Sequence, residues 1–388
     1  MLNSFLYPWN SSLEQMRLTL KQISSTFLIL ILLLIHLACP EPPDNKPQKA
    51  DCPVGKSPCA DDSTACCWDT TSHNFTWEID TLGISGTLRD VQIIDENNIW
   101  VVGEIETDST EYNAAIWDGI KWNLIQIKPQ GYVQELQTIY MINDEEIWFS
   151  RGSLPIYYDG STFDMLTPAE NGYPGGFIIN DIWGSSANDI YFVGTDGNIV
   201  HYDGTSFTKM TSPTTQDLDG IVGVVDSETG EKRIWVNGWG GYPYRGFLMQ
   251  YDGTDWEIVW DENNPFFEGS QYIEPTLHIP DEKYLVIYSG GQDNSILSIH
   301  EQEDLQQYEI LHYDYHGFIR SLAGDKVNDI IGVGDLTNAI HFNGSTVVQI
   351  DELENMVPAF RYLAVDSKGG IIVIVSDTPY VIRGRKLE

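Results

Sequence analysis

The chain has 388 residues, of which 57 are Asp or Glu and 21 are Lys or Arg, so its formal net charge is −36. A chain this acidic is repelled by the phosphates of nucleic acids and by anionic lipid surfaces, so we exclude binding of DNA, RNA or peripheral lipid. The hydrophobic fraction of 42%, with 12% aromatic residues, is sufficient for a packed core and excludes disorder as the reason for the charge. We therefore expect a globular protein with an acidic surface.

Residues 1–38 have the pattern of a signal peptide. Arg17 and Lys21 precede an apolar run from Phe27 to Ile35, which is too short to span a bilayer, since that requires about 20 apolar residues. Cys39 follows Leu-Ala at the end of the apolar region, an arrangement that resembles the lipobox of bacterial lipoproteins and implies lipid attachment to Cys39. Lipoboxes prefer Leu where His36 stands, so secretion without lipid is the alternative.

Both interpretations predict export. We expect a lipoprotein of the bacterial outer membrane or cell surface, with a periplasmic or extracellular protein as the alternative. The only membrane contact that we expect is through the lipid anchor.

Residues 39–73 have the composition of a linker rich in Pro and Cys. Four cysteines fall within sixteen residues, and four cysteines allow three pairings. Disulfides are favoured over a zinc site, because the segment has no C-x-x-C pair and no nearby group of histidines. The cysteines are Cys52, Cys59, Cys66 and Cys67.

An internal repeat organises the rest of the chain. Five Asp-Gly or Asn-Gly steps recur at spacings of 41, 44, 49 and 91 residues, and the last spacing predicts a degenerate copy near Glu301. Such steps between alternating apolar strands are typical of a hairpin, and we expect type I′ turns, in which both central residues have positive φ. The steps begin at Asp118, Asp159, Asp203, Asp252 and Asn343.

A second element, a short apolar strand, recurs seven times upstream of these turns. Its copies are on average about 45 residues apart, and each repeat has four predicted strands, which is typical of a propeller blade. The copies are centred on Trp100, Trp148, Tyr191, Trp235, Leu285, Ile331 and Ile372.

The two ends of the repeat region complement each other. The last repeat ends without a convincing fourth strand, whereas an orphan strand from Phe75 to Asp80 precedes the first repeat. Joining them closes the ring and removes an exposed sheet edge. We therefore predict an all-β fold in which residues 74–388 form one seven-bladed β-propeller of four-stranded blades, the last blade completed by the N-terminal strand.

Three of the Asp-Gly steps stand in Tyr-Asp-Gly strings, which begin at Tyr158, Tyr202 and Tyr251. These strings, together with the segment from Ile182 to Phe207, resemble the tandem-repeat propeller lipoproteins of environmental bacteria that are often labelled glucosyltransferase. The resemblance covers about four-fifths of the chain. It implies the propeller fold, but its motif residues are turn and core positions. We therefore transfer no catalytic residue from it.

In a propeller, the short turns lie on one face, and the longer connections, in which binding residues gather, lie on the other. Two long connections of the fourth and fifth blades are rich in aromatic residues, which suit sugar rings or peptide side chains. Packing on the propeller itself is the alternative role. The candidate ligand-binding residues are Trp239, Tyr242, Tyr244, Arg245, Phe266 and Phe267.

Carboxylates recur in the second-to-third loops of the blades and raise the question of a Ca²⁺ site. Their spacing fits no calcium-binding repeat, so we predict no metal and no cofactor. These residues are Asp108, Asp196, Asp293, Asp335 and Asp377.

No nucleophile elbow, zinc-binding helix or phosphate loop is present in the sequence, so we assign no catalytic residue. His201 and His341 share a repeat position, which indicates a structural role, and His312 and His316 are expected to form a polar cluster. The leading hypothesis is a monomeric, non-enzymatic exported protein that binds an extracellular glycan or envelope protein through its loop-rich face. A secreted carbohydrate-active enzyme with paired carboxylates is the alternative, and an envelope scaffold is a third hypothesis.

Overall fold

The structure is a computed structural model that describes residues 52, 56–60, 63–167, 172–240, 245–261, 274–278, 283–290, 295–302, 304–313, 318–354 and 356–387. The chain divides into two compact units, one comprising Met1–Pro53 with Ser57–Cys66 and the other comprising Val54–Lys56 with Cys67–Glu388. The second unit contains all seven blades of the propeller.

The N-terminal region contains two short strands and disulfide bonds. β1 (Lys56–Pro58) pairs with β2 (Cys66–Trp68), and Cys52 is bonded to Cys66. Cys59 and Cys67 are also disulfide-bonded, which confirms the prediction of disulfides. Cys39 and the signal peptide lie outside the described residues. Within the described residues, no helix has the length and hydropathy needed to cross a membrane.

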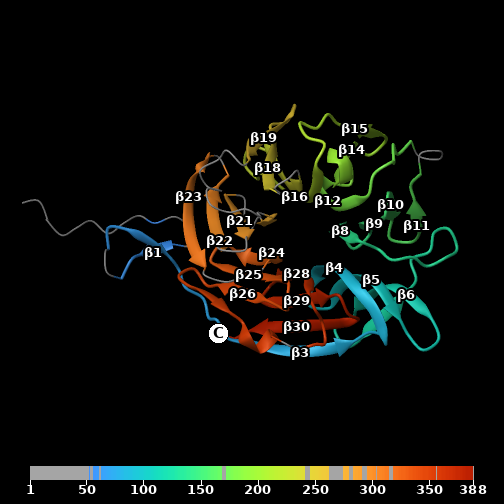
Figure 1. The fold of residues 1–388 in the computed structure, drawn as a ribbon, viewed down its shortest axis with the longest axis horizontal. Helices are drawn as coiled ribbons and strands as arrows, with labels where there is room; N and C mark the ends of the chain where they lie inside the picture. The colour runs from blue at the N-terminus through green and yellow to red at the C-terminus, as the bar shows by residue number, and fades with distance from the viewer. Residues whose placement is uncertain are drawn as a thin grey trace, which may run out of the picture. The chain divides into compact units, whose positions relative to one another are not determined.

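The propeller has seven four-stranded antiparallel blades, as predicted (Figure 1). Blade 1 contains β4 (Ser85–Asp95), β5 (Asn98–Glu106), β6 (Glu111–Trp117) and β7 (Trp122–Ile125). Blade 2 contains β8 (Thr138–Asn143), β9 (Glu146–Arg151), β10 (Leu154–Tyr158) and β11 (Phe163–Met165). Blade 3 contains β12 (Ile179–Ser186), β13 (Asp189–Gly194), β14 (Ile199–Tyr202) and β15 (Phe207–Lys209), with the short 3-10 turn η1 (Thr195–Gly197).

The remaining blades follow in chain order. Blade 4 contains β16 (Asp217–Val225), β17 (Lys232–Gly240), β18 (Arg245–Tyr251) and β19 (Trp256–Trp260). Blade 5 contains β20 (Glu274–His278), β21 (Tyr284–Gly290), β22 (Ser295–Glu301) and β23 (Asp304–Tyr313). Blade 6 contains β24 (Ile319–Lys326), β25 (Asp329–Gly334), β26 (Ala339–Phe342) and β27 (Val347–Gln349), followed by the 3-10 turn η3 (Asp351–Leu353). Blade 7 contains β28 (Tyr362–Lys368), β29 (Ile371–Ser376), β30 (Tyr380–Lys386) and β3 (Phe75–Thr81).

Blade 7 is assembled from both ends of the propeller, which confirms the closure prediction. β3 pairs antiparallel with β30 over seven residues, from Phe75 opposite Lys386 to Thr81 opposite Tyr380. Figure 1 shows β3, in blue, beside β30, in red. The degenerate repeat near Glu301 is also confirmed, because β22 and β23 join there and the buried Gln302 amide donates to the Tyr284 carbonyl.

The repeated Asp-Gly and Asn-Gly steps form hairpins, but the predicted type I′ geometry is wrong. In each turn only the glycine has positive φ, between 87° and 95°. The preceding Asp or Asn instead accepts the backbone N–H groups two and three residues later, at 2.7–3.0 Å. A four-residue turn capped by its first side chain therefore replaces the two-residue turn.

The hydrophobic core consists of clusters between neighbouring blades. The described residues form seven such clusters, and each joins the facing sides of two adjacent blades. Trp148 and Trp235, both fully buried on second strands, are among the largest buried side chains. The recurring apolar second strand of the sequence therefore forms the centre of each blade's packing.

Candidate binding face

The antiparallel order of the strands gives the propeller two chemically different faces. The turns that join first to second and third to fourth strands lie on one face, here called the turn face. The second-to-third and blade-to-blade connections lie on the opposite face, here called the loop face.

The predicted ligand-binding residues fall largely outside the described part of the chain. Trp239 lies at the end of β17, half-buried, between Asp217 of β16 and Gly246 of β18. The structure describes the backbone of Arg245 at the start of β18 but not its side chain. Tyr242, Tyr244, Phe266 and Phe267 lie outside the described residues, so the aromatic site stays a prediction.

Exposed apolar side chains gather on the loop face instead. Among the described residues, six large apolar side chains are at least half exposed, and five of these lie in loop-face connections. The sixth, Ile120, is 86% exposed on the turn face. The five are Ile84 (68%), Tyr132 (50%), Ile178 (51%), Leu336 (58%) and Phe360 (64%).

Hydrogen bonds fix the backbone at three of these residues. The Ile84 N–H donates to the Glu106 carbonyl at 2.7 Å. The Ile178 N–H donates to Thr195 Oγ1 at 3.1 Å, and its carbonyl accepts the Thr195 N–H at the same distance. The Phe360 N–H donates to Asp377 Oδ1 at 2.9 Å. Because the backbone is fixed at these residues, the loops lose little backbone entropy when a partner binds.

Leu336 has an unusual backbone conformation. Its φ is +56°, in the left-handed region that disfavours a residue with a Cβ, and yet its side chain is exposed. Such a conformation costs about 1–2 kcal/mol for an L-residue. The turn itself holds this conformation, because the Gly334 N–H donates to the Asn338 carbonyl, as the Gly194 N–H donates to that of Asn198 in the same loop of blade 3, where Asp196 has a φ of +59°.

Arginines surround these apolar residues. The Arg320 Nε donates to Asp335, and Arg361 Nε lies 3.5 Å from Asp377 Oδ2. Asp335 and Arg361 also form an isolated backbone bridge, so the two ion pairs are neighbours. We name the surface made by Leu336, Phe360, Arg320 and Arg361 the blade 6–7 patch.

A second arginine region lies over blades 1 and 2. Arg89 donates to Glu135 at 2.7 Å, and the Arg151 guanidinium lies 5.3 Å from the ring centre of Tyr132. Arginines and exposed aromatic side chains are the residue types enriched at protein interfaces.

The repeated loop carboxylates have structural roles where they are described. Asp335 and Asp377 pair with arginines, and Asp196 has a φ of +59° within η1. Asp108 lies in the exposed connection between β5 and β6, and Asp293 lies outside the described residues. In the described part of the chain, no three His, Cys, Asp or Glu side chains are grouped as a metal site requires.

The repeated histidines have structural partners. His201 Nε2 lies 2.8 Å from Asp189, and His341 Nε2 lies 2.8 Å from Asp329. His300 occupies the same position in the repeat, although its degenerate turn conceals this in the sequence. The side chain of His312 and all of His316 lie outside the described part of the chain.

Carboxylates also lie between the inner strands, around the centre of the propeller. Asp90 accepts the Ile139 N–H of the next blade at 2.9 Å, and Asp181 accepts the Ile221 N–H at 2.9 Å. Asp366 accepts the Ile93 N–H at 2.6 Å. Each carboxylate therefore pairs with a backbone donor on an inner strand whose edge has no further strand beside it.

Burial changes the acidity of these carboxyl groups. It raises the pKa of Asp181 and that of Asp366 to about 7, and the charge of Asp90 raises both further. Burial raises the pKa of Asp90 as well. Since their oxygens accept backbone hydrogen bonds, we interpret the three groups as links between blades.

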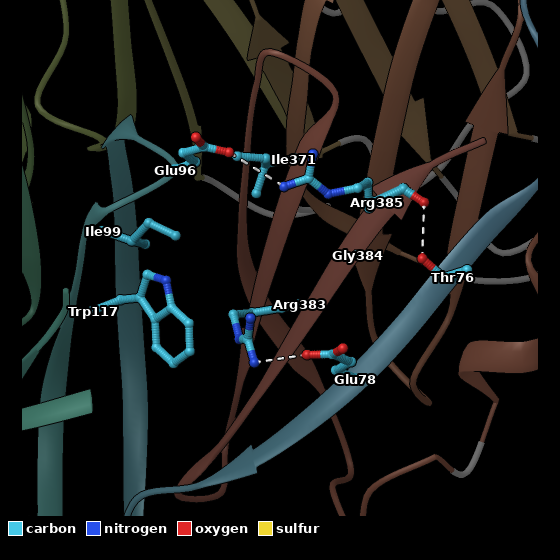
Figure 2. A pocket seen from close by; sticks show the side chains of 9 residues that line it. All are labelled: Thr76, Glu78, Glu96, Ile99, Trp117, Ile371, Arg383, Gly384 and Arg385. Atoms are coloured by element: carbon cyan, nitrogen blue, oxygen red, sulfur yellow. Dashed lines mark hydrogen bonds and ion pairs between the residues drawn. The ribbon is translucent and has the colours of Figure 1, made fainter. Parts of the chain in front are cut away.

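A pocket of about 250 Å³ lies between blades 7 and 1 (Figure 2). Arg383 pairs with Glu78 and Asp80, and its guanidinium lies 3.9 Å from the Trp117 ring centre. Arg385 lies 3.5 Å from Glu96. Both guanidinium groups already have carboxylate partners, so the pocket does not favour an anionic ligand. Its lining comprises Thr76, Glu78, Glu96, Ile99, Trp117, Ile371, Arg383, Gly384 and Arg385.

Comparison with known proteins identifies the fold alone. The sequence matches no protein-family model and no curated protein. Among solved structures, YCF48 bound to a D1 peptide is similar, with a TM-score of 0.59 and 15% identity over 82% of this chain and 99% of that one.

Two further propellers are similar in structure. Virginiamycin B lyase from Staphylococcus aureus has a TM-score of 0.61 and 10% identity over 81% of this chain and 100% of its own. The WD40 β-propeller domain of Doa1 has a TM-score of 0.54 and 12% identity over 82% and 99%. These neighbours have different roles, so they support the propeller and no particular activity.

Proposed function

We propose that this chain is an exported, non-enzymatic propeller that binds a protein segment through its loop face. The observation that carries this proposal is the gathering of exposed apolar side chains on that face, five of the six that are at least half exposed among the described residues. Leu336 and Phe360 lie in loops that the Asp335–Arg361 bridge joins, and an exposed apolar patch marks an interaction site, whereas isolated apolar side chains need no explanation.

The chemistry of these side chains favours a protein over a glycan. Ile84, Ile178 and Leu336 are aliphatic and branched, which suits packing against other side chains, whereas sugar rings stack on flat aromatic faces. The ion-paired arginines beside them give the surface the mixed apolar and polar character of a protein interface.

The comparison with YCF48 gives independent support. That protein has been solved with a bound D1 peptide, so a propeller of this kind has held a peptide. The identity of 15% does not transfer the ligand, and the partner of this chain is expected to have its own sequence.

Binding to arrayed peptides and arrayed glycans tests this function. We expect the purified chain to bind members of a peptide array, and Phe360→Asp to weaken that binding by on the order of 30-fold, the effect of losing an interface anchor worth about 2 kcal/mol. Ile120→Asp is the matched control, because Ile120 is more exposed but lies on the turn face. Binding only to glycans, or equal losses in both variants, would contradict the proposal.

The export route is a second part of the proposal. The resemblance to lipoboxes and to tandem-repeat propeller lipoproteins supports lipid on Cys39, which would hold the propeller at a membrane surface. Mass spectrometry of the membrane-associated protein is expected to find Cys39 as a lipid-modified N-terminus. An unmodified N-terminus elsewhere, or a Cys39→Ser protein that still fractionates with membranes, would argue for secretion or another anchor.

A further inference from the structure

A short segment before β3 is held tightly against blade 6. We name residues 69–74 the strap. The Thr71 N–H donates to the Asn343 carbonyl at 2.9 Å, and the Asn343 amide donates back to the Thr71 carbonyl at 2.9 Å. The Asn328 amide donates to the Asp69 carbonyl at 2.6 Å, and Lys386 Nζ donates to Thr71 Oγ1 at 2.7 Å.

The sequence of blade 6 is adapted to the strap. Its third-to-fourth turn begins with Asn343, where four other blades have aspartate. Only an amide donates a hydrogen bond to the Thr71 carbonyl, whereas a carboxylate would repel it. Gly344 follows, and a Cβ on it would lie 2.3 Å from the Asp69 carbonyl oxygen. The docked strap therefore accounts for the asparagine, and it adds a steric conflict at Gly344, where a φ of +95° already favours glycine as in the other four turns.

Two histidines meet where the strap is docked. His73 Nδ1 of the strap lies 2.7 Å from His341 Nδ1 of β26, so these two nitrogens share one proton. His341 Nε2 lies 2.8 Å from Asp329 Oδ1 and carries a proton toward that carboxylate, which leaves Nδ1 of neutral His341 as an acceptor. His73 is then the donor, and its Nε2 lies 2.9 Å from Thr346 Oγ1.

The contact between His73 and His341 depends on how many protons the two imidazoles carry. One added proton is tolerated, because it gives His73 Nε2 a hydrogen that Thr346 Oγ1 accepts. A second added proton gives both facing Nδ1 atoms a hydrogen, and two donors at 2.7 Å repel each other. The contact between His73 and His341 is therefore incompatible with two charged imidazoles.

The charged groups around the pair are Asp329 of β25 and Lys386 of β30, whose Nζ donates to Asp329. The Phe75 ring packs edge-on against His341, which is 1% exposed. Burial is the largest cause that lowers the pKa of both histidines below 6.5, with Lys386 lowering it further and Asp329 opposing. Because the lowered pKa belongs to the docked state, docking is fully stable above the ordinary histidine pKa and weakens as the pH falls below it.

We propose that the His73–His341 contact is an acid-sensitive latch that holds the strap on blade 6 at neutral pH and releases it when both imidazoles are charged. The strap directly follows the disulfide-bonded residues, so its release frees the connection between them and β3. The latch does not depend on the proposed binding function, since it lies on turn-face residues.

Hydrogen exchange of the Thr71 amide tests the latch in the full chain. Between about pH 7.5 and about pH 5, and after correction for the intrinsic exchange rate, we expect protection of Thr71 to fall roughly tenfold. This is the factor that corresponds to the loss of one hydrogen bond. The amides of β29, on the inner part of blade 7, report whether the propeller itself stays folded.

Two variants distinguish the latch from a general acid effect. His73→Gln cannot be charged, so its Thr71 protection should not change with pH. His201→Gln is the matched control. His201 pairs with Asp189, which accepts from Lys232, just as His341 pairs with Asp329, which accepts from Lys386, but among the described residues no second histidine is hydrogen-bonded to His201. Unchanged protection in the parent, an equal fall in His73→Gln, or loss of the fall in His201→Gln would each overturn the proposal.

Discussion

Replacing Gly384 with alanine tests whether β3 closes the ring in the register that the structure shows. Gly384 lies in β30 directly opposite Trp77 of β3. A Cβ on Gly384 would lie 2.2 Å from an atom of the Trp77 ring, well inside van der Waals contact. The φ of Gly384 is not in the left-handed region, so the substitution introduces a steric conflict without backbone strain.

The expected magnitude follows from overpacking. Inserting a methyl group into a packed interface costs about 1–3 kcal/mol, because the ring of Trp77 must leave its position among the residues between blades 6 and 7. With an unfolding entropy of about 2.1 cal/mol/K per residue over roughly 300 residues, each kcal/mol shifts the Tm by about 1.5 °C. We expect Gly384→Ala to lower the Tm by roughly 2–5 °C.

A double-mutant cycle with Trp77→Ala isolates the cause. In the Trp77→Ala background the ring is absent, so Gly384→Ala should be neutral or stabilising by up to about 1 kcal/mol, because alanine suits a strand better than glycine. Calorimetry of the four proteins measures the coupling. An equal loss of Tm in both backgrounds would refute the inferred register of the closing strand.

Three further predictions concern pH and backbone strain. Burial raises the pKa of folded Asp181 to about 7, so its contribution to stability is lost as the pH rises from about 4 through 7. The Tm of the parent relative to that of Asp181→Asn should therefore fall over this range, and a constant difference would contradict the prediction. Burial lowers the pKa of His300 to about 4, so the Tm of the parent relative to that of His300→Gln should fall as the pH drops from 6.5 toward 4. A difference in Tm that does not change with pH would show that His300 is not buried in its neutral form. Leu336→Gly relieves a left-handed conformation, so we expect an unchanged or slightly higher Tm together with weaker peptide binding; a lower Tm would assign Leu336 to packing.

The sequence was sufficient to predict the propeller because the repeated residues are those that form the turns and the central strand of each blade. The Asp-Gly turns and apolar second strands are local features, and even the degenerate turn near Glu301 could be located from spacing. The type I′ assignment failed because the side chain of the turn's first residue, such as Asp118, caps the backbone. Dipeptide identity alone does not reveal that competition.

The candidate site was harder to predict because exposure depends on neighbouring blades. Leu82 and Ile84 are both aliphatic and two residues apart, yet Leu82 is 7% exposed and Ile84 is 68% exposed. Phe360 and Tyr362 differ in the same way, at 64% and 0%. The strap could not be predicted for a similar reason, since the partners of His73 are far away in the sequence.

Site-specific photo-crosslinking in the producing cell tests the binding function most directly. A photoreactive phenylalanine analogue at position 360 on the loop face, compared with the same analogue at position 120 on the turn face, reports which face meets a partner even when that partner is unidentified. We predict a crosslinked protein of discrete mass from position 360 and none from position 120. Crosslinking from position 120 alone, or from neither position, would contradict a protein-binding loop face.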